Sequence, residues 1–278
     1  MRPRLSIVIV NFNGRGHLER CLASLAAHPP SVAHETVVVD NASTDGSAAL
    51  VRGWPAVRLI ELPANVGFSA GNNAGIRATS GELVLLLNND TVVPAGALDT
   101  LVARLEAHPA AAIAGPRLVD GDGAAELSFG PMISPLGELR QKLIVGAGER
   151  GLRPARWLIG RATRRERYVD WVSGACLLVR RAVAEEVELL DERFFLYTED
   201  VDFCASVRAR GWKVLFTPAA EIVHLRGRSR ATAARLANAA YRRSHLAFYE
   251  KHHPRWAPVL RWYLRRKGQL PTEPGPTR

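Results

Sequence analysis

The sequence predicts an α/β fold with a doubly wound, mostly parallel central sheet, helices on both faces and a C-terminal helical extension. The main observation is that short apolar runs alternate strictly with helix-like segments through the first 108 residues. The runs are continuous, which is typical of strands buried on both faces. A length of 278 residues with 47% hydrophobic and 23% charged residues allows a sizeable core and excludes a disordered or fibrous chain.

The individual elements follow from the period of the apolar residues. Runs of β-branched residues or leucine predict strands at 5–10, 36–40, 57–62 and 83–88. Segments with one apolar face predict helices at 17–27, 47–54, 69–79 and 95–108. The second half is less regular, with strands expected at 169–179, 214–217 and 221–224 and helices near 181–188, 201–210, 231–251 and 256–267.

Two classes of protein are excluded by what the sequence lacks. The longest uncharged, mostly apolar run has about nine residues, against the roughly 20 that cross a bilayer, and the N-terminus has no signal-peptide cleavage pattern. We therefore expect neither a membrane span nor secretion by a classical signal. Cys21, Cys176 and Cys204 are scattered and odd in number, which indicates core residues in a reducing cytosol rather than a disulfide scaffold or zinc site.

The net charge of +10 is concentrated in two segments. Residues 226–267 hold 12 Lys or Arg and one acid, and residues 136–168 hold nine Lys or Arg and three acids. Such segments favour an anionic surface or substrate, and a solvated basic surface is the alternative. Residues 256–267 combine two tryptophans and a tyrosine with arginines, which is typical of a helix at an anionic lipid surface. No zinc, helix-turn-helix or RNA-recognition signature accompanies the charge, so specific nucleic-acid binding is not expected.

Polar residues gather where the predicted strands end. They are Asn11, Asn13, Asp40, Asn41, Asp45, Asn88, Asn89 and Asp90. Ligands of open α/β sheets bind at this edge, although neither a dinucleotide-binding glycine motif nor a P-loop is present. Asp40 could either cap a turn or accept a hydrogen bond from a pyrimidine N3–H through its carboxylate. In the second role Asn13 would help to bind the pyrimidine. Asp90 suits either a turn or a ligand of a divalent cation.

Two further places could carry chemistry. Residues 197–203 (YTEDVDF) hold three acids within four residues, which suits either a solvated helix start or a general base with a raised pKa. Arg208 and Arg210, at helical spacing, can satisfy only some of these acids. His224 follows a predicted strand and is equally suited to a metal ligand or an ordinary loop histidine.

Taken together, these residues resemble the family 2 glycosyltransferases of the GT-A fold, and in particular a bacterial branch that includes rhamnosyltransferases acting on polyprenyl-diphosphate-linked sugars. The resemblance covers residues 4–230 and rests on seven motifs in family order. They are SIVIVNFNG, VVVDNASTDGS, NVGFSAGNNAGI, LLLNND, WVSGACLLVRR, DERFFLYTEDVDFCASVRARGW and HLRGRS.

The resemblance implies a role for each candidate residue. Asp40 would contact the pyrimidine of a UDP- or dTDP-sugar, Asp90 and His224 would ligate Mg²⁺ or Mn²⁺ on the diphosphate, and Asp200 would be the catalytic base. The donor side would also include Asn11, Asn13, Asn65, Gly67, Asn88 and Asn89. The acceptor side would include Trp171, Gly174 and Glu199. With one base and direct attack, transfer would invert the anomeric configuration.

Two departures refine this expectation. The metal motif of the family is often Asp-x-Asp, and its first acid is Asn88 here, so metal binding would depend on Asp90, His224 and the diphosphate. This loss also leaves open a catalytically inactive scaffold that only binds sugar nucleotides. The Gln-x-x-Arg-Trp motif of processive synthases is absent, which favours transfer of a single sugar, to a lipid-linked saccharide of a cell-wall or surface polysaccharide.

The expected organisation has three parts. Residues 1–230 would form the glycosyltransferase domain, with a nucleotide-sugar half at 1–116 and an acceptor half at 117–230 that contains the basic insertion 136–168. Residues 231–267 would be a basic helical extension, followed by a disordered tail at 268–278. We expect an enzyme of the cytoplasm that is peripheral on the inner face of the cell membrane.

Overall fold

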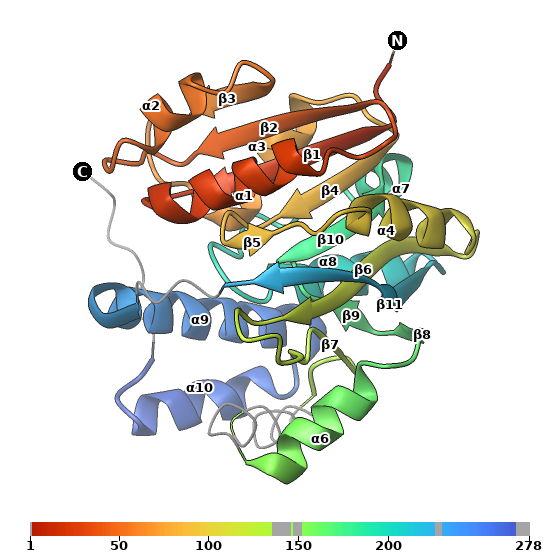
Figure 1. The fold of residues 1–278 in the computed structure, drawn as a ribbon. Helices are drawn as coiled ribbons and strands as arrows, with labels where there is room; N and C mark the ends of the chain where they lie inside the picture. Colours follow the sequence, from red (N-terminus) through yellow and green to blue (C-terminus); the bar gives the residue numbers. More distant parts are fainter. Residues whose placement is uncertain (1, 135–145, 147–151, 226–229, 271–278) are drawn as a thin grey trace.

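The computed structural model describes residues 2–134, 146, 152–225 and 230–270 (Figure 1). Strand and helix alternate in the first half, in the order β1 (Leu5–Asn11), α1 (Arg15–Ala27), β2 (His34–Asp40), α2 (Ser47–Arg52), β3 (Val57–Glu61), α3 (Phe68–Arg77), β4 (Leu83–Leu87), β5 (Thr91–Val92) and α4 (Ala97–Glu106). The second half contains β6 (Ala111–Val119), β7 (Phe129–Gly130), α6 (Arg153–Ala162), β8 (Arg167–Val169), β9 (Trp171–Val172), β10 (Cys176–Arg180), α7 (Arg181–Glu186), α8 (Glu199–Ala209), β11 (Lys213–His224), α9 (Arg230–His252) and α10 (Ala257–Arg266).

A central sheet of nine strands organises the molecule. Its order is β3-β2-β1-β4-β10-β6-β11-β5, with β8 paired to β11. The first four strands of this order are parallel, as are β6 and β11, whereas β10 is antiparallel to both of its neighbours. The predicted mostly parallel α/β sheet is confirmed, and its carboxyl edge carries the ends of β1, β2 and β4 side by side.

Both faces of the sheet are covered, as the continuous apolar runs predict. Ile7 and Ile9 of β1 pack in one cluster with residues of α1, α2 and α4. Val8 points to the opposite face and packs with residues of α3, α7 and α8. Gly71 and Gly75 let α3 approach β1, because a Cβ at Gly75 would collide with Val8. These two glycines therefore have a packing role.

The second half departs from the sequence-based expectation at several elements, among them helix α6 and strand β7, which the sequence does not predict. Strand β6 was not expected, because its alanines and Pro116 are weak strand formers. The strand expected at 169–179 is divided, since the backbone at Gly174 turns aside to donate a hydrogen bond to Asp200 Oδ2 at 2.8 Å. The strands expected at 214–217 and 221–224 form one strand, β11, with an irregularity between Thr217 and Glu221.

Helices α9 and α10 pack against the domain near α8. Phe248 and Tyr249 of α9 and Ala257 at the start of α10 form a third buried cluster with Phe194 and Val201. In Figure 1, α10 and α6 lie at the end of the molecule opposite β2 and β3. No helix in the described part of the chain combines the length and apolar character needed to span a bilayer. Much of the basic insertion (135–145 and 147–151) and residues 271–278 of the expected tail lie outside the described residues.

Candidate active site

A cavity of about 280 Å³ with both polar and apolar lining opens at the carboxyl edge of the sheet. It is lined by Val10, Phe12, Asn41, Asn65, Gly67, Phe68, Asn88, Asn89, Asp90, Phe195 and Leu196. Most of these residues follow β1, β2 and β4 or begin α3, whereas Phe195 and Leu196 come from the loop between α7 and α8. Five of the predicted site residues, Asn65, Gly67, Asn88, Asn89 and Asp90, therefore share one cavity.

Asn11 and Asp40 are buried at the strand ends beside this cavity. Asn11 Nδ2 donates to Asp40 Oδ1 at 3.3 Å, and Asn11 Oδ1 accepts from Asn89 Nδ2 at 2.6 Å. The backbone N–H of Ser43 donates to Asp40 Oδ2 at 2.9 Å. These bonds join the ends of β1, β2 and β4, so the position of Asp40 is fixed before any ligand binds.

A second set of amides shapes the wall made by the start of α3. Asn41 Nδ2 donates to Asn65 Oδ1 at 2.9 Å and to the carbonyl of Gly67 at 3.0 Å. Gly67 has φ 90°, and a Cβ there would lie 2.5 Å from the carbonyl oxygen of Phe195. Glycine is therefore required at this position. Asn41 is predicted only as one of the polar residues at the strand ends, and the sequence gives it no separate role at the site.

Asn13 lies apart from the cavity. It is exposed, has φ 49°, and its Oδ1 accepts from the backbone N–H of Thr44 at 2.8 Å. This contact ties the loop after β1 to the loop after β2. Asn13 thus supports the residues that line the cavity and does not line it itself.

Asp90 and His224 come together although they lie far apart in the sequence. Strand β11 pairs with β5, and His224 Nε2 lies 3.3 Å from Asp90 Oδ1. On the other side, His224 Nδ1 lies 3.1 Å from Glu126 Oε2. Burial lowers the pKa of His224, but the hydrogen bonds with Asp90 and Glu126 outweigh it and raise the pKa to about 9. In the absence of a cation the imidazole is therefore protonated between two carboxylates, and it has to lose a proton before it can act as a metal ligand. No local signal marks Glu126 in the sequence.

Asn88, next to Asp90, adds an amide oxygen that could ligate a metal ion. Its Oδ1 is buried and has no hydrogen-bond partner among the described residues. A carboxylate, an imidazole and a free amide oxygen form a donor set that suits Mg²⁺ or Mn²⁺. Within the same described ranges, no group of three or more His, Cys, Asp or Glu residues is arranged as a complete metal site. Part of the coordination shell would therefore come from a ligand or water.

Asp200 lies in the first turn of α8, because this helix begins at Glu199, two residues earlier than the sequence predicts. Tyr197 and Thr198 precede it with φ of 71° and 65°, a conformation that non-glycine residues rarely adopt and that is concentrated at functional sites. A Cβ at Gly174 would lie 3.3 Å from Asp200 Cβ and 3.7 Å from the ring of Phe68, which lines the cavity. Asp200 is thus separated from the cavity by little more than Gly174, whose N–H holds its carboxylate.

Burial raises the pKa of both acids at this helix start. The pKa of Glu199 is raised well above its ordinary value by burial and then by the charge of Asp200. The pKa of Asp200 is also raised by burial, while backbone N–H groups of Gly174 and Val201 oppose the rise. The pKa of Glu199 is thus raised more strongly than that of Asp200. Glu199 Oε2 has no hydrogen-bond partner in the part of the chain that the structure describes.

The remaining acid of this motif has a structural environment. Asp202 is buried and contacts Lys251 and His252 of α9. The arginines that follow on α8 pair elsewhere, Arg208 with Asp170 and Arg210 with Glu186, so helical spacing gave the wrong partners. Trp171 donates from its Nε1 to the carbonyl of Pro131 at 2.9 Å and packs against two hydrophobic clusters.

The mixed sheet with a cavity at its carboxyl edge is the GT-A fold of glycosyltransferases. A mannosyltransferase of Pyrobaculum calidifontis in complex with GDP-mannose and Mn²⁺ superimposes with a TM-score of 0.62 at 20% identity, over 94% of this chain and 68% of that one. GalNAc-T7 with UDP, GalNAc and Mn²⁺ gives 0.59 at 18% identity, over 81% and 43% of the two chains.

The chain belongs to glycosyltransferase family 2, whose model matches residues 3–257. It is 33% identical to an N-acetylglucosaminyl-diphospho-decaprenol L-rhamnosyltransferase of Mycobacterium tuberculosis, over 95% of this chain and 90% of that protein. It is also 31% identical to a low-salt glycan biosynthesis hexosyltransferase of Haloferax volcanii, over 75% of this chain and 62% of that protein. The protein is therefore a glycosyltransferase, as the motifs predict.

Proposed function

We propose that this protein is an inverting, divalent-metal-dependent glycosyltransferase that transfers one sugar, with rhamnose the first to test, from a UDP- or dTDP-sugar to a hydroxyl of a polyprenyl-diphosphate-linked saccharide. The reaction would serve cell-wall or surface polysaccharide synthesis. The observation that carries the proposal is the half-buried carboxylate of Asp200, held by the N–H of Gly174 next to Phe68, which lines the cavity. The mycobacterial relative, named for a rhamnosyl transfer to a lipid-linked sugar, supports the choice of acceptor.

The donor would occupy the cavity between the strand ends and the loop between α7 and α8. Asp40 would accept a hydrogen bond from the pyrimidine N3–H, because its carboxylate is fixed by Asn11 and Ser43 before the donor arrives. Asn41, Asn65 and the backbone at Gly67 offer donors and acceptors to the ribose and diphosphate. The side chains of Phe12, Phe68 and Phe195 would limit access of water.

The diphosphate end of the donor would lie at Asp90, His224 and Asn88, which would hold Mg²⁺ or Mn²⁺. The cation, when bound, neutralises the negative charge that develops on the leaving diphosphate. The free Oδ1 of Asn88 can take part although the residue lacks the charge of an acid. This arrangement favours an active enzyme over an inactive scaffold.

Asp200 would remove the proton from the attacking acceptor hydroxyl. Its raised pKa makes it a better base than an ordinary aspartate, and its two backbone hydrogen bonds fix its orientation. The acceptor hydroxyl would attack the anomeric carbon from the side opposite the diphosphate. One displacement by one nucleophile inverts the configuration and forms no covalent glycosyl intermediate.

The direct test is a transfer assay with purified protein. UDP- and dTDP-sugars, including the rhamnosyl donor, are incubated with Mn²⁺ or Mg²⁺ and a polyprenyl-diphosphate-N-acetylglucosamine acceptor. We expect one sugar per acceptor, with the anomeric configuration inverted in the NMR spectrum of the product, and no transfer in the presence of EDTA. A product with retained configuration, or a polymer, would contradict the proposal.

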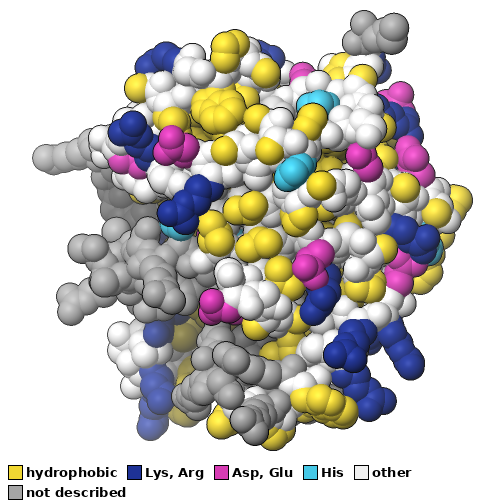
Figure 2. All heavy atoms as spheres, in the orientation of Figure 1, with side chains coloured by type: hydrophobic (Ala, Val, Ile, Leu, Met, Phe, Trp, Pro, Cys, Tyr) yellow, Lys and Arg dark blue, Asp and Glu magenta, His cyan; other side chains and the backbone are white. Residues whose placement is uncertain are grey.

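The same reaction calls for contact with an anionic membrane surface, and α10 supplies a suitable face. Trp256, Val259, Trp262 and Tyr263 are 50–57% exposed, while Ala257 and Leu264 on the other side of the helix are buried. The guanidinium of Arg266 lies over Trp262, and Arg265 and Lys267 are also exposed. On α6, Trp157 and Leu158 are exposed as well. Figure 2 shows basic and apolar side chains next to one another at this end of the molecule.

We expect Arg265→Glu to weaken binding to vesicles that contain anionic lipid by about fivefold or more, since each basic residue near such a surface contributes about 1 kcal/mol. Arg20→Glu on α1, an equally exposed change of charge in the other half of the molecule, is the matched control and should bind as the wild type does. Cosedimentation at two salt concentrations measures both. Equal loss in the two variants would mean that only net charge matters, and the α10 face would be wrong.

A further inference from the structure

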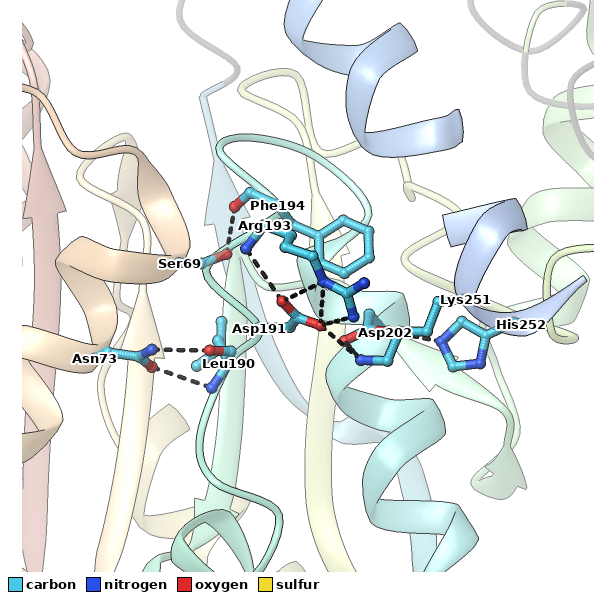
Figure 3. Close-up of polar contacts among 9 residues, drawn as sticks. All are labelled: Ser69, Asn73, Leu190, Asp191, Arg193, Phe194, Asp202, Lys251 and His252. Carbon is cyan, nitrogen blue, oxygen red and sulfur yellow. Dashed lines mark hydrogen bonds and ion pairs between the residues drawn. The ribbon is translucent and has the colours of Figure 1, made fainter. Parts of the chain in front are cut away.

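The loop between α7 and α8, residues 187–198, connects the donor cavity to the proposed base. It supplies Phe195 and Leu196 to the cavity and leads directly into the first turn of α8, which carries Asp200. On one side it is held by α3. Ser69 Oγ donates to the carbonyl of Phe194 at 2.6 Å, and the side chain of Asn73 bonds to both backbone groups of Leu190 (Figure 3).

On the other side, α9 holds the same loop through charged groups. Lys251 Nζ lies 2.9 Å from Asp191 Oδ2, inside the loop, and 2.8 Å from Asp202 Oδ2, on α8 after the loop. His252 Nε2 lies 2.6 Å from Asp202 Oδ1, as Figure 3 shows. Ser244 Oγ adds a hydrogen bond to the carbonyl of Leu196 at 2.8 Å. One lysine thus joins the two ends of the segment that contains the base.

Because this cluster is buried, the loss of any one of its contacts would be costly. The side chain of Asp202 is 2% exposed, and each of its carboxylate oxygens has one cationic or imidazole partner from α9. A buried carboxylate that loses its partner is still desolvated, and this destabilises the protein. Helix α9 must therefore stay in place for Asp202 of α8 to remain paired, so the positions of the two helices depend on each other. Hydrogen bonds from Arg193, and then from Lys251, hold the pKa of Asp191 well below its ordinary range despite partial burial, so Asp191 stays charged.

We propose that Asp202, Asp191, Lys251 and His252 form a positioning cluster that sets the loop and the first turn of α8, and with them the direction of the Asp200 carboxylate. The inference rests on the proposed function for its catalytic part. Lys251 and His252 are positioning residues, because they act through Asp202 and not on the substrate. The helix that follows β11 is thereby part of the catalytic machinery of this enzyme, and not only a carrier of the membrane-facing α10.

The test compares Lys251→Met with Lys251→Arg, which keeps the charge, and with Arg210→Met, which removes an exposed ion pair from the far end of α8. Asp191→Asn is the milder variant if Lys251→Met does not fold, since it loosens the loop and leaves the contacts of Asp202 in place. We expect Lys251→Met or Asp191→Asn to lower kcat at least tenfold with donor KM within about threefold. Lys251→Arg should recover most of the rate, and Arg210→Met should match the wild type.

Hydrogen exchange supplies a readout that does not depend on activity. The amides of residues 190–203 should exchange at least tenfold faster in Lys251→Met or Asp191→Asn than in the wild type or Arg210→Met. Unchanged exchange would overturn the cluster whatever the enzyme does. Faster exchange with unchanged kcat would overturn its role in catalysis. If the wild type transfers no sugar from any donor, the proposed function fails, and the exchange data still decide whether the cluster holds the loop.

Discussion

Asp200→Asn is expected to abolish sugar transfer while the affinity for the donor nucleotide stays within a few-fold of the wild type. The amide cannot accept the proton of the acceptor hydroxyl, and a general base is worth about 10²- to 10⁴-fold in rate. The change is nearly isosteric, and the N–H groups of Gly174 and Val201 can still donate to the remaining oxygen. Single-turnover transfer and calorimetric titration with the nucleotide measure the two quantities.

Glu199→Gln is the variant that tells the two neighbouring acids apart. Because Glu199 keeps its proton to higher pH than Asp200, its replacement by a neutral side chain should cost far less than Asp200→Asn. If the Asp200→Asn enzyme kept more than about a tenth of the wild-type rate, the assignment of Asp200 as the general base would be wrong. Glu199 would then be the next candidate, since Asp202 is engaged with α9.

The pH dependence gives a second check on the same group. Burial raises the pKa of Asp200 above the 3.8 of an ordinary aspartate, and the base acts only when it is ionised. Activity should therefore be lost as the pH falls through this raised value, so the acidic limb of kcat/KM begins at a higher pH than a normal aspartate would give. Since the two acids are coupled, the limb reports the pair. An acidic limb at or below 3.8 would contradict the assignment.

Asp90→Ala and His224→Ala are each expected to remove most of the metal-dependent part of donor binding. With Asn88 neutral, the described chain offers few other ligands at this point, and loss of one should weaken Mn²⁺- or Mg²⁺-dependent affinity by about tenfold or more. Asp40→Ala should instead lower nucleotide affinity equally with and without metal, because Asp40 lies by the pyrimidine in the proposed pose.

Calorimetry of donor binding in Mn²⁺ and in EDTA separates these outcomes. The wild type should bind more tightly in Mn²⁺, and the two ligand variants should lose this difference while their affinity in EDTA stays similar. If both variants kept the full gain from metal, the metal site at Asp90 and His224 would be wrong. If Asp40→Ala lost affinity only in Mn²⁺, its assignment to the base of the nucleotide would be wrong.

Much of the donor side could be predicted from the sequence because it is local. The buried runs that form β1, β2 and β4 are continuous in the chain, and the polar residues that follow them reach the same edge of any parallel sheet. Asn88, Asn89 and Asp90 are expected at a site for this reason, whereas Asn65 and Gly67 are expected from the family resemblance, and all five line one cavity. Asn13, chosen by the same rule, lies outside it, because the backbone turns at φ 49° after β1.

The sequence by itself therefore determined the fold class, the family and the edge of the sheet where the site lies, because periodic burial and ordered motifs are properties of neighbouring residues. Only the tertiary structure decided the partners of the side chains. Gly174 holds Asp200 across 26 positions, Lys251 meets Asp202 across 49, and His224 meets Glu126 across 98. Such contacts depend on how β10, α8, α9 and β11 pack in space, and no local pattern of residues encodes which buried charge will face which partner.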